Sequence, residues 1–289
     1  GYTVGTIDKL ESIKGYKTEL SRDEFFDQVN KIGIAVTSQS GNLVPADKKI
    51  YALRDVSGTT ESIPLIASSI MSKKIASGAK YIVIDVKVGN GALMKNIEDA
   101  RLLAKTMIEL GKSYGRKVTC ILSSMEEPLG YAIGNGLEVK EAIACLQNKG
   151  PKDVTDLCIN LASEMVSMGK NIPLEDALRE VKEILSSGRA YETFKNYIKY
   201  QGGNLDDICV SDKCISIKSK QTGFIEHINA LELGELAKKL GAGRSRKDDE
   251  ISYGVGFVLS KKVGDYVLEN EELLKVYIDN SSVSVDSII

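Results

Sequence analysis

The first part of the chain alternates between short apolar runs and longer segments whose apolar residues recur at helical spacing. The runs predict strands at 34–36, 81–86 and 117–122, and the longer segments predict helices at 21–32, 97–114 and 137–147. The first of these helices begins with a capping box, in which Ser21 and Glu24 satisfy each other's backbone N–H groups. Such strand–helix alternation predicts an α/β fold, with a mostly parallel sheet and helices on both of its faces.

A small helical segment is predicted between the first two strands. A first short helix begins with Pro45 in its opening turn, where a missing N–H group costs nothing, and a second helix begins at Ser62. On the second helix Ile63, Ile66 and Ile70 recur at helical spacing. We therefore expect that face of the helix to pack on a core.

The second half of the chain changes character at the Gly-rich stretch 201–204. Helices are predicted before it at 153–169, 173–187 and 190–200, and short alternating strands after it at 215–218, 223–225, 254–259 and 273–277. Asn229 is expected to cap one helix among these strands. The predicted domains are an α/β domain made of 1–44 and 77–203, a helical segment at 45–76, and a β-rich C-terminal domain at 204–289.

Composition and charge exclude several classes of protein. The chain has 38 basic and 40 acidic residues, a formal net charge of −2 and no basic patch, which argues against a nucleic-acid partner. No apolar run is long enough to span a membrane, and the start of the sequence does not have the pattern of a signal peptide. The five cysteines are scattered and odd in number, which is typical of reduced thiols in the cytosol. We therefore expect a cytoplasmic protein without a membrane partner.

The most informative chemistry lies in the helical segment. Ser69 and Lys73 are four residues apart and share a face of the second helix, and Arg54 at the end of the first helix is within reach of the same space. A hydroxyl and two cations beside an apolar stripe are suited to hydrogen-bond a small planar ligand that carries carbonyl groups. The alternative is an ordinary surface helix with basic residues in its last turn, and spacing alone favours that alternative.

Residues 45 to 74 as a whole resemble the signature of thymidine phosphorylases and pyrimidine-nucleoside phosphorylases. The similarity continues along the chain in further blocks: Gly5 to Ser12, taken as the end of the phosphate-site strand and its loop, Asp85 to Ala92, Gly134 to Ala142, Leu240 to Arg244, and Lys262 to Asp265. These blocks follow the order of the family and cover nearly the whole chain. On this basis the chain is identified as a member of that family.

The resemblance implies a glycosyltransferase of nucleoside salvage, which converts a pyrimidine nucleoside and phosphate into the free base and a pentose 1-phosphate. It implies that Arg54 and Lys73 donate to the carbonyl oxygens of the pyrimidine and that Ser69 meets the ring-nitrogen edge. It places the hydroxyl of Thr6 in the phosphate site, and it makes 45–76 a remnant of a helical pyrimidine-binding domain. It further implies a homodimer.

The C-terminal part is similar to the β-rich C-terminal domain of the same phosphorylases, which resembles biotinyl and lipoyl carriers. A carrier displays a lysine at a hairpin tip within a motif such as Met-Lys-Met, and this chain has no such motif. A carrier function is therefore rejected, and no cofactor is required.

Some members of the family hold a potassium or calcium ion near the phosphate loop. The resemblance maps its ligands onto the backbone oxygens of Leu129 and Ala132 and onto Glu141. Ligands that are all oxygens suit a hard cation. The alternative for Glu141 is a solvated helix residue, and its position in the predicted helix does not favour either interpretation.

One family motif is absent from these residues, a Gly-rich loop of the form Lys-His-Ser-Thr-Gly-Gly-Val-Gly-Asp. In addition, Tyr2 and Val4 stand where the family has His and Gly, and the one histidine is His227. Because phosphate ligands and a base-contacting histidine belong to that loop, we expect the 289 residues alone to show little phosphorolysis. Two alternatives stay open: a catalytically silent fragment that keeps the fold, and an anthranilate phosphoribosyltransferase-like enzyme, against which the helical segment argues. Thymidine-only and broader uridine and thymidine specificity are both compatible with the sequence.

Overall fold

The computed structural model describes residues 5–38, 44–47, 49–50, 59, 61–244 and 249–279. The chain divides into two compact units. The first consists of 1–38, 126–155 and 184–289, and the second of 39–125 and 156–183. The predicted division into three domains stays a prediction. In the described part of the chain, no helix combines the length and the apolar character that crossing a bilayer requires.

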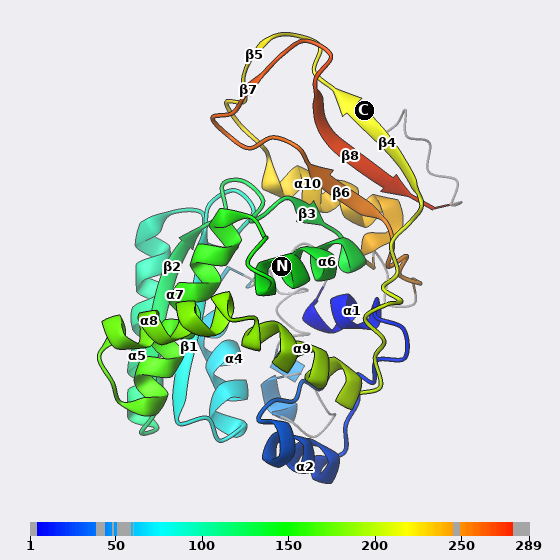
Figure 1. The fold of residues 1–289 in the computed structure, drawn as a ribbon. Coiled ribbons are helices and arrows are strands. Elements are labelled where there is room, and N and C mark those ends of the chain that lie inside the picture. The colour runs from blue at the N-terminus through cyan, green and yellow to red at the C-terminus, as the bar shows by residue number, and fades with distance from the viewer. Residues whose placement is uncertain are drawn as a thin grey trace. The chain divides into compact units, whose positions relative to one another are not determined.

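A parallel pair of strands lies in the second unit, next to α4 and α5 (Figure 1). The elements are α4 (Ile63–Ala76), β1 (Tyr81–Val88), α5 (Ile97–Ser113) and β2 (Lys117–Ser124). Strands β1 and β2 pair in parallel from Tyr81 opposite Lys117 to Val88 opposite Ser124. The buried side chains of Ile66, Met71 and Met107 hold the helices on these strands. The predicted α/β fold with a parallel sheet is confirmed.

The apolar stripe of α4 packs as predicted. Ile66 is buried, and Ile63 and Ile70 pack against the same cluster as partly buried side chains. Of the predicted helix that precedes α4, residues 45–47, 49 and 50 are helical. The remainder of that prediction lies outside the described residues.

Helices dominate the N-terminal part of the first unit. They are α1 (Thr6–Glu11), α2 (Arg22–Ile32), α6 (Asn135–Leu146) and α9 (Arg189–Tyr200), while α7 (Lys152–Lys170) and α8 (Leu174–Ser186) contain residues of both units. The capping box at the start of α2 is confirmed, because Ser21 and Glu24 exchange hydrogen bonds with each other's N–H groups. The buried side chains of Ile13, Tyr197 and Ile198 form the core of this part.

Two predictions for the N-terminal region are wrong. Residues 34–36 are not a strand, because buried glutamine side chains bind their backbone in place of a neighbouring strand. Gln201 accepts from the N–H of Val36 at 3.2 Å and donates to its carbonyl at 2.9 Å, and Gln28 donates to the carbonyl of Ile34 at 3.0 Å. Residues 6–11 are the helix α1 and not the end of a strand with its loop.

The predicted C-terminal β-rich domain is confirmed. Its elements are β4 (Lys213–Lys218), β5 (Gly223–Phe224), α10 (Ala230–Ala237), η1 (Lys238–Ala242), β6 (Gly256–Leu259), β7 (Tyr266–Val267) and β8 (Glu272–Ile278). Strands β4, β8 and β6 form an antiparallel sheet, which the long arrows of Figure 1 show, and β5 pairs with β7. Val255 and Phe257 are fully buried in its core. The resemblance to biotinyl and lipoyl domains is not tested by this arrangement.

The sheet of the C-terminal domain receives one strand from outside the predicted domain. Strand β3 (Ala132–Ile133) pairs with β6 in antiparallel register, with Ala132 opposite Val258. Gly256 makes this approach possible, because its φ is +145° and a Cβ atom there would lie 2.0 Å from the carbonyl oxygen of Ile133. The segment that precedes β3 is thereby fixed to the C-terminal sheet.

Candidate active site

Helix α4 brings Ser69 and Lys73 together on one face. Ser62 precedes the helix and Pro64 lies in its first turn, where proline is tolerated. The ammonium of Lys73 donates to the hydroxyl oxygen of Ser69 at 3.1 Å and to the carbonyl oxygen of Ser69 at 3.2 Å. The i, i+4 spacing seen in the sequence therefore places the two side chains in direct contact.

Asp47 completes this polar group, and sequence reasoning did not select it. Its carboxylate pairs with the ammonium of Lys73 at 2.6 Å, and the Asp47 side chain is 11% exposed. The only signal in the sequence was its place in the first turn of the helix that begins with Pro45. Because the Asp47 carboxylate is largely removed from water and pairs with the ammonium, it fixes the direction of the Lys73 side chain.

A pocket of about 260 Å³ adjoins this group. Its lining residues are Val44, Pro45, Ala46, Asp47, Ile50, Leu65, Ser68, Ser69 and Ser72. Pockets for drug-sized ligands measure roughly 300–1,000 Å³, so this smaller space suits a ring-sized molecule. Since the oxygen of Ser69 accepts from Lys73, the hydroxyl hydrogen of Ser69 is left to donate to a ligand in the pocket.

The other residues predicted to bind substrate are placed differently. Arg54 lies outside the described residues. Thr6 is the exposed first residue of α1, in the first compact unit, whereas Ser69 and Lys73 belong to the second. The structure thus brings Ser69 and Lys73 together within one unit and describes Thr6 separately.

The predicted ion ligands surround the segment that leads into β3. Oε1 of Glu141 accepts from the N–H groups of Tyr131 at 2.8 Å and of Ala132 at 3.0 Å. Burial raises the pKa of the Glu141 carboxyl above its ordinary value, the two N–H groups act against this, and the carboxylates of Glu138 and Asp153 add to the rise. Glu141 is half-buried and bonded to the loop, so it is not a solvated helix residue.

The register of β3 turns the main chain of Ala132 toward Glu141, so two of the three predicted ligands lie on the same side of the strand. Tyr131 accepts a ladder hydrogen bond from Leu259, so the main-chain groups of the next residue, Ala132, face away from β6. The N–H group of Ala132 accordingly reaches Glu141, and its carbonyl lies on the same side of the strand. A half-buried carboxylate beside backbone carbonyls is the donor set of a hard cation. In the described part of the chain, no cluster of three or more His, Cys, Asp or Glu side chains offers an alternative metal site.

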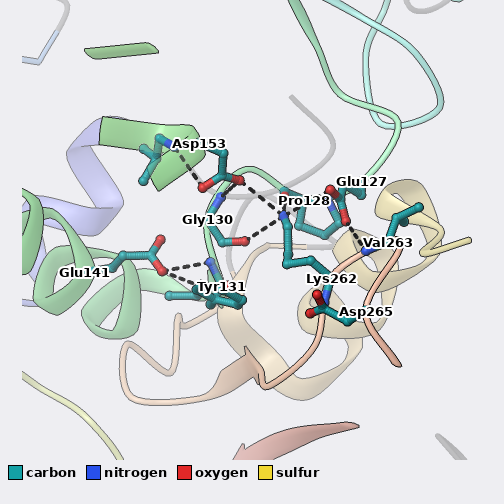
Figure 2. A network of polar contacts seen from close by, with 11 residues as sticks. Glu127, Pro128, Gly130, Tyr131, Glu141, Asp153, Lys262, Val263 and Asp265 are labelled. Atoms are coloured by element: carbon teal, nitrogen blue, oxygen red, sulfur yellow. Dashed lines mark hydrogen bonds and ion pairs between the residues drawn. The ribbon is translucent and has the colours of Figure 1, made fainter. Parts of the chain in front are cut away.

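Lys262 contacts the residues that precede β3, as Figure 2 shows, whereas Glu141 contacts Tyr131 and Ala132. The Lys262 ammonium donates to the carbonyl oxygens of Pro128 and of Gly130, the latter at 3.1 Å. It also lies 3.3 Å from the carboxylate of Asp153 and 3.6 Å from that of Glu127. Sequence reasoning noted Lys262 only as part of a family block and missed its partners, because all of them are distant in the sequence.

Comparison with known proteins gives two matches to family models. The glycosyl transferase family a/b domain matches residues 1–191, and the pyrimidine nucleoside phosphorylase C-terminal domain matches residues 224–288. The order of the two matches agrees with the α/β and β-rich parts of the described fold.

Curated relatives match nearly the whole chain. The proteins of Bacillus subtilis (strain 168), Staphylococcus haemolyticus (strain JCSC1435) and Geobacillus stearothermophilus, each named pyrimidine-nucleoside phosphorylase, are 50% identical over 290 residues. The alignments cover 98% of this chain and 67% of each relative. Matches of this extent, together with both family models, show that the chain belongs to the pyrimidine-nucleoside phosphorylase family of glycosyltransferases.

Proposed function

We propose that this chain acts in the phosphorolysis of pyrimidine nucleosides, which yields the free base and a pentose 1-phosphate. The observation that carries the proposal is the contact between Ser69 and Lys73 on α4, next to a ring-sized pocket. The relatives that carry the name pyrimidine-nucleoside phosphorylase support the same assignment.

The base site is proposed to act on the leaving group. When the bond between sugar and base breaks, negative charge develops on the pyrimidine. The positive charge of Lys73 and the hydroxyl of Ser69 are held together beside the pocket, where they stabilise this charge. Asp47 holds Lys73 in place. Arg54, which lies outside the described residues, is proposed as a further donor to the base.

The phosphate side is proposed to use the hydroxyl of Thr6 as one donor. A potassium or calcium ion, held by the carbonyl oxygens of Leu129 and Ala132 and by Glu141, would supply a fixed positive charge nearby. Two observations support that ligand set: the main chain of Ala132 faces Glu141, and Glu141 is half-buried. No other cofactor is proposed.

Two measurements on the purified chain test the proposal. Titration calorimetry with uracil and with thymine is expected to show binding of the free base. Incubation with uridine or thymidine is expected to release base slowly, because the Gly-rich loop is absent from these residues, and only when inorganic phosphate is present. Comparison of the two nucleosides gives the specificity. Base release that is independent of phosphate would indicate a hydrolase and contradict the proposal, as would a chain that binds neither base. Base binding without turnover identifies the silent alternative.

We further propose that the protein is a cytoplasmic homodimer. The five cysteines, all within the described part of the chain, form no disulfide, which suits a reducing compartment. Analytical ultracentrifugation over a range of concentrations tests the dimer, and a monomer at every concentration would contradict it. Fractionation of cells that express the protein tests the location.

A further inference from the structure

Lys262 lies in the tight turn between β6 and β7, and this turn fixes its backbone. The N–H group of Lys262 donates to the carboxylate of Asp265 at 2.7 Å, and the N–H group of Asp265 donates back to the carbonyl of Lys262 at 3.1 Å. The next residue, Val263, donates to Glu127 at 3.0 Å. These main-chain contacts therefore fix the position of the Lys262 Cα independently of the contacts of its ammonium.

The ammonium of Lys262 is almost enclosed. The side chain is 13% exposed, and the ring centre of Tyr131 lies 5.8 Å from its nitrogen. An ammonium has three N–H donors, and the carbonyls of Pro128 and Gly130 together with the carboxylate of Asp153 provide an acceptor for each. A buried charge satisfied in this way is held in one geometry.

The loop 127–131 is consequently bound through both kinds of main-chain group. The carbonyls of Pro128 and Gly130 accept from Lys262, whereas the N–H groups of Gly130 and Tyr131 donate to carboxylates. The acceptor for Gly130 is Asp153, at 2.9 Å, and that carboxylate also faces Lys262. The carbonyls on either side of Leu129, those of Pro128 and Gly130, thus both face the ammonium. The backbone conformation of Leu129 is thereby fixed.

Carboxylates outnumber cations around this loop. Burial raises the pKa of the Tyr131 hydroxyl above its ordinary value. Four nearby carboxylates raise this pKa further: those of Asp265, Asp153, Glu127 and Glu141. An additional cation would reduce the repulsion among these groups. Lys262 is already the cation on one side of the loop. Of the predicted ion ligands, Leu129 lies on this loop and Ala132 follows it directly in β3.

We propose that Lys262 is a positioning residue for the ion site, in that it orients the loop so that Leu129, Ala132 and Glu141 face one cation. The inference rests on the ion site proposed above. It assigns the C-terminal domain a part in the chemistry of the α/β region, since Lys262 comes from the β6–β7 turn and Glu141 from α6. Outer-shell groups of this kind typically contribute about 10–100-fold to metal affinity.

The test uses the sign of the change in cation affinity. Terbium binding to the whole chain is followed by its luminescence, excited through tyrosine, and calcium affinity is obtained from displacement of the terbium. Lys262→Met removes a nearby positive charge, which by repulsion alone would strengthen cation binding. If Lys262 positions the ligands, the variant instead binds calcium about 10–100-fold more weakly.

Lys261→Met is the matched control. Lys261 precedes Lys262 directly, but its ammonium pairs with Glu271 at 2.5 Å and donates to the carbonyl of Tyr266 at 3.2 Å, both inside the C-terminal domain. This variant is expected to keep its calcium affinity within about twofold. Tighter or unchanged binding in a folded Lys262→Met variant would overturn the proposal, because a purely structural role changes stability and not affinity.

A second variant covers the case in which Lys262→Met does not fold. Lys262→Arg keeps the charge, but its planar donors do not match three surrounding acceptors, so we expect an affinity between those of the unaltered chain and the Met variant. Affinity equal to that of the unaltered chain would overturn the proposal. Absence of terbium binding to the unaltered chain would also overturn it, while base binding and phosphate-dependent cleavage, measured separately, would still decide the proposed function.

Discussion

Two pairs of neighbouring lysines differ in how their surroundings are built. On α4, Lys73 contacts Ser69 and Asp47, whereas Lys74 is exposed. In the β6–β7 turn, Lys262 is enclosed by the 127–131 loop, whereas Lys261 pairs within its own domain. In each pair one ammonium is fixed by polar partners beside a candidate site, and its neighbour serves as an internal control.

The difference between the two regions lies in the distance along the chain. Ser69 is four residues from Lys73, and a helix brings such residues together whatever the rest of the fold does. The carbonyls of Pro128 and Gly130 are 134 and 132 residues from Lys262. The contact of Ser69 with Lys73 is a local property of one helix, whereas the contacts of Lys262 require the 127–131 loop to meet the β6–β7 turn.

The largest expected effect is that of Gly130→Ala on the loop side. The φ of Gly130 is +70°, and an added Cβ would lie 2.2 Å from the Glu141 carboxylate. The left-handed conformation and the displaced carboxylate together are expected to lower the free energy of unfolding by about 2–4 kcal/mol, measured by urea denaturation. Gly115→Ala is the control, because its φ is +66° in open space. Equal losses in both variants would show that Glu141 is not held where the structure places it.

The next effect concerns the α4 side and compares the two lysines of that helix. Lys73→Met removes a charged donor from the base site, and we expect uracil binding to weaken by about 1.5–3 kcal/mol, measured by calorimetry. Lys74→Met is expected to leave binding unchanged, since Lys74 is exposed. Similar losses in both variants would mean that general charge, rather than the geometry with Ser69, attracts the ligand.

The pH dependence of stability distinguishes two carboxyls of the loop region. Burial alone raises the pKa of Asp153, but the N–H groups of Gly130 and Val154 and the ammonium of Lys262 bring it below its ordinary value of 3.8. Its contribution to stability is therefore present above that value and is lost as the pH falls through the lowered pKa. The thermal-midpoint advantage of the unaltered chain over Asp153→Asn should shrink with acidification.

Glu141 should show the opposite trend. Its pKa is raised, so its contribution is present at low pH and is lost as the pH rises through the raised value. The unaltered chain should gain stability relative to Glu141→Gln as the pH falls from 7 to 4. Parallel trends for the two variants would contradict the different surroundings of the two carboxyls.

The smallest expected effect is that of Ser72→Ala. Ser72 lines the same pocket as Ser69, but its hydroxyl donates to the carbonyl of Ser69 at 3.1 Å, within the helix. Removal of such a local bond should change the free energy of unfolding by less than about 0.5 kcal/mol and leave uracil binding intact. Ser69→Ala, tested beside it, should weaken binding. Loss of binding in Ser72→Ala would show that Ser72, one turn further along α4, contacts the base in place of Ser69.

The amino-acid sequence by itself determined the features that depend on near neighbours. The capping box at Ser21 starts α2, the isoleucine stripe turns α4 to its core, and the β-branched run that begins at Tyr81 forms β1. The contact of Ser69 with Lys73 follows from helical spacing in the same way. These features form from interactions within a few residues, so their patterns can be recognised along the chain.

Only the tertiary structure decided the rest. The apolar run at 34–36 satisfied the pattern of a strand, but the side chains of Gln28 and Gln201 bind its backbone instead. The place of Ala132 in the C-terminal sheet and the partners of Lys262 likewise depend on segments more than a hundred residues apart. Such contacts have no period along the sequence, because the folded chain and not the spacing of residues brings their partners together. The same reason explains why the predicted ligand Glu141 was found by resemblance, while the lysine that holds its loop was found only in the structure.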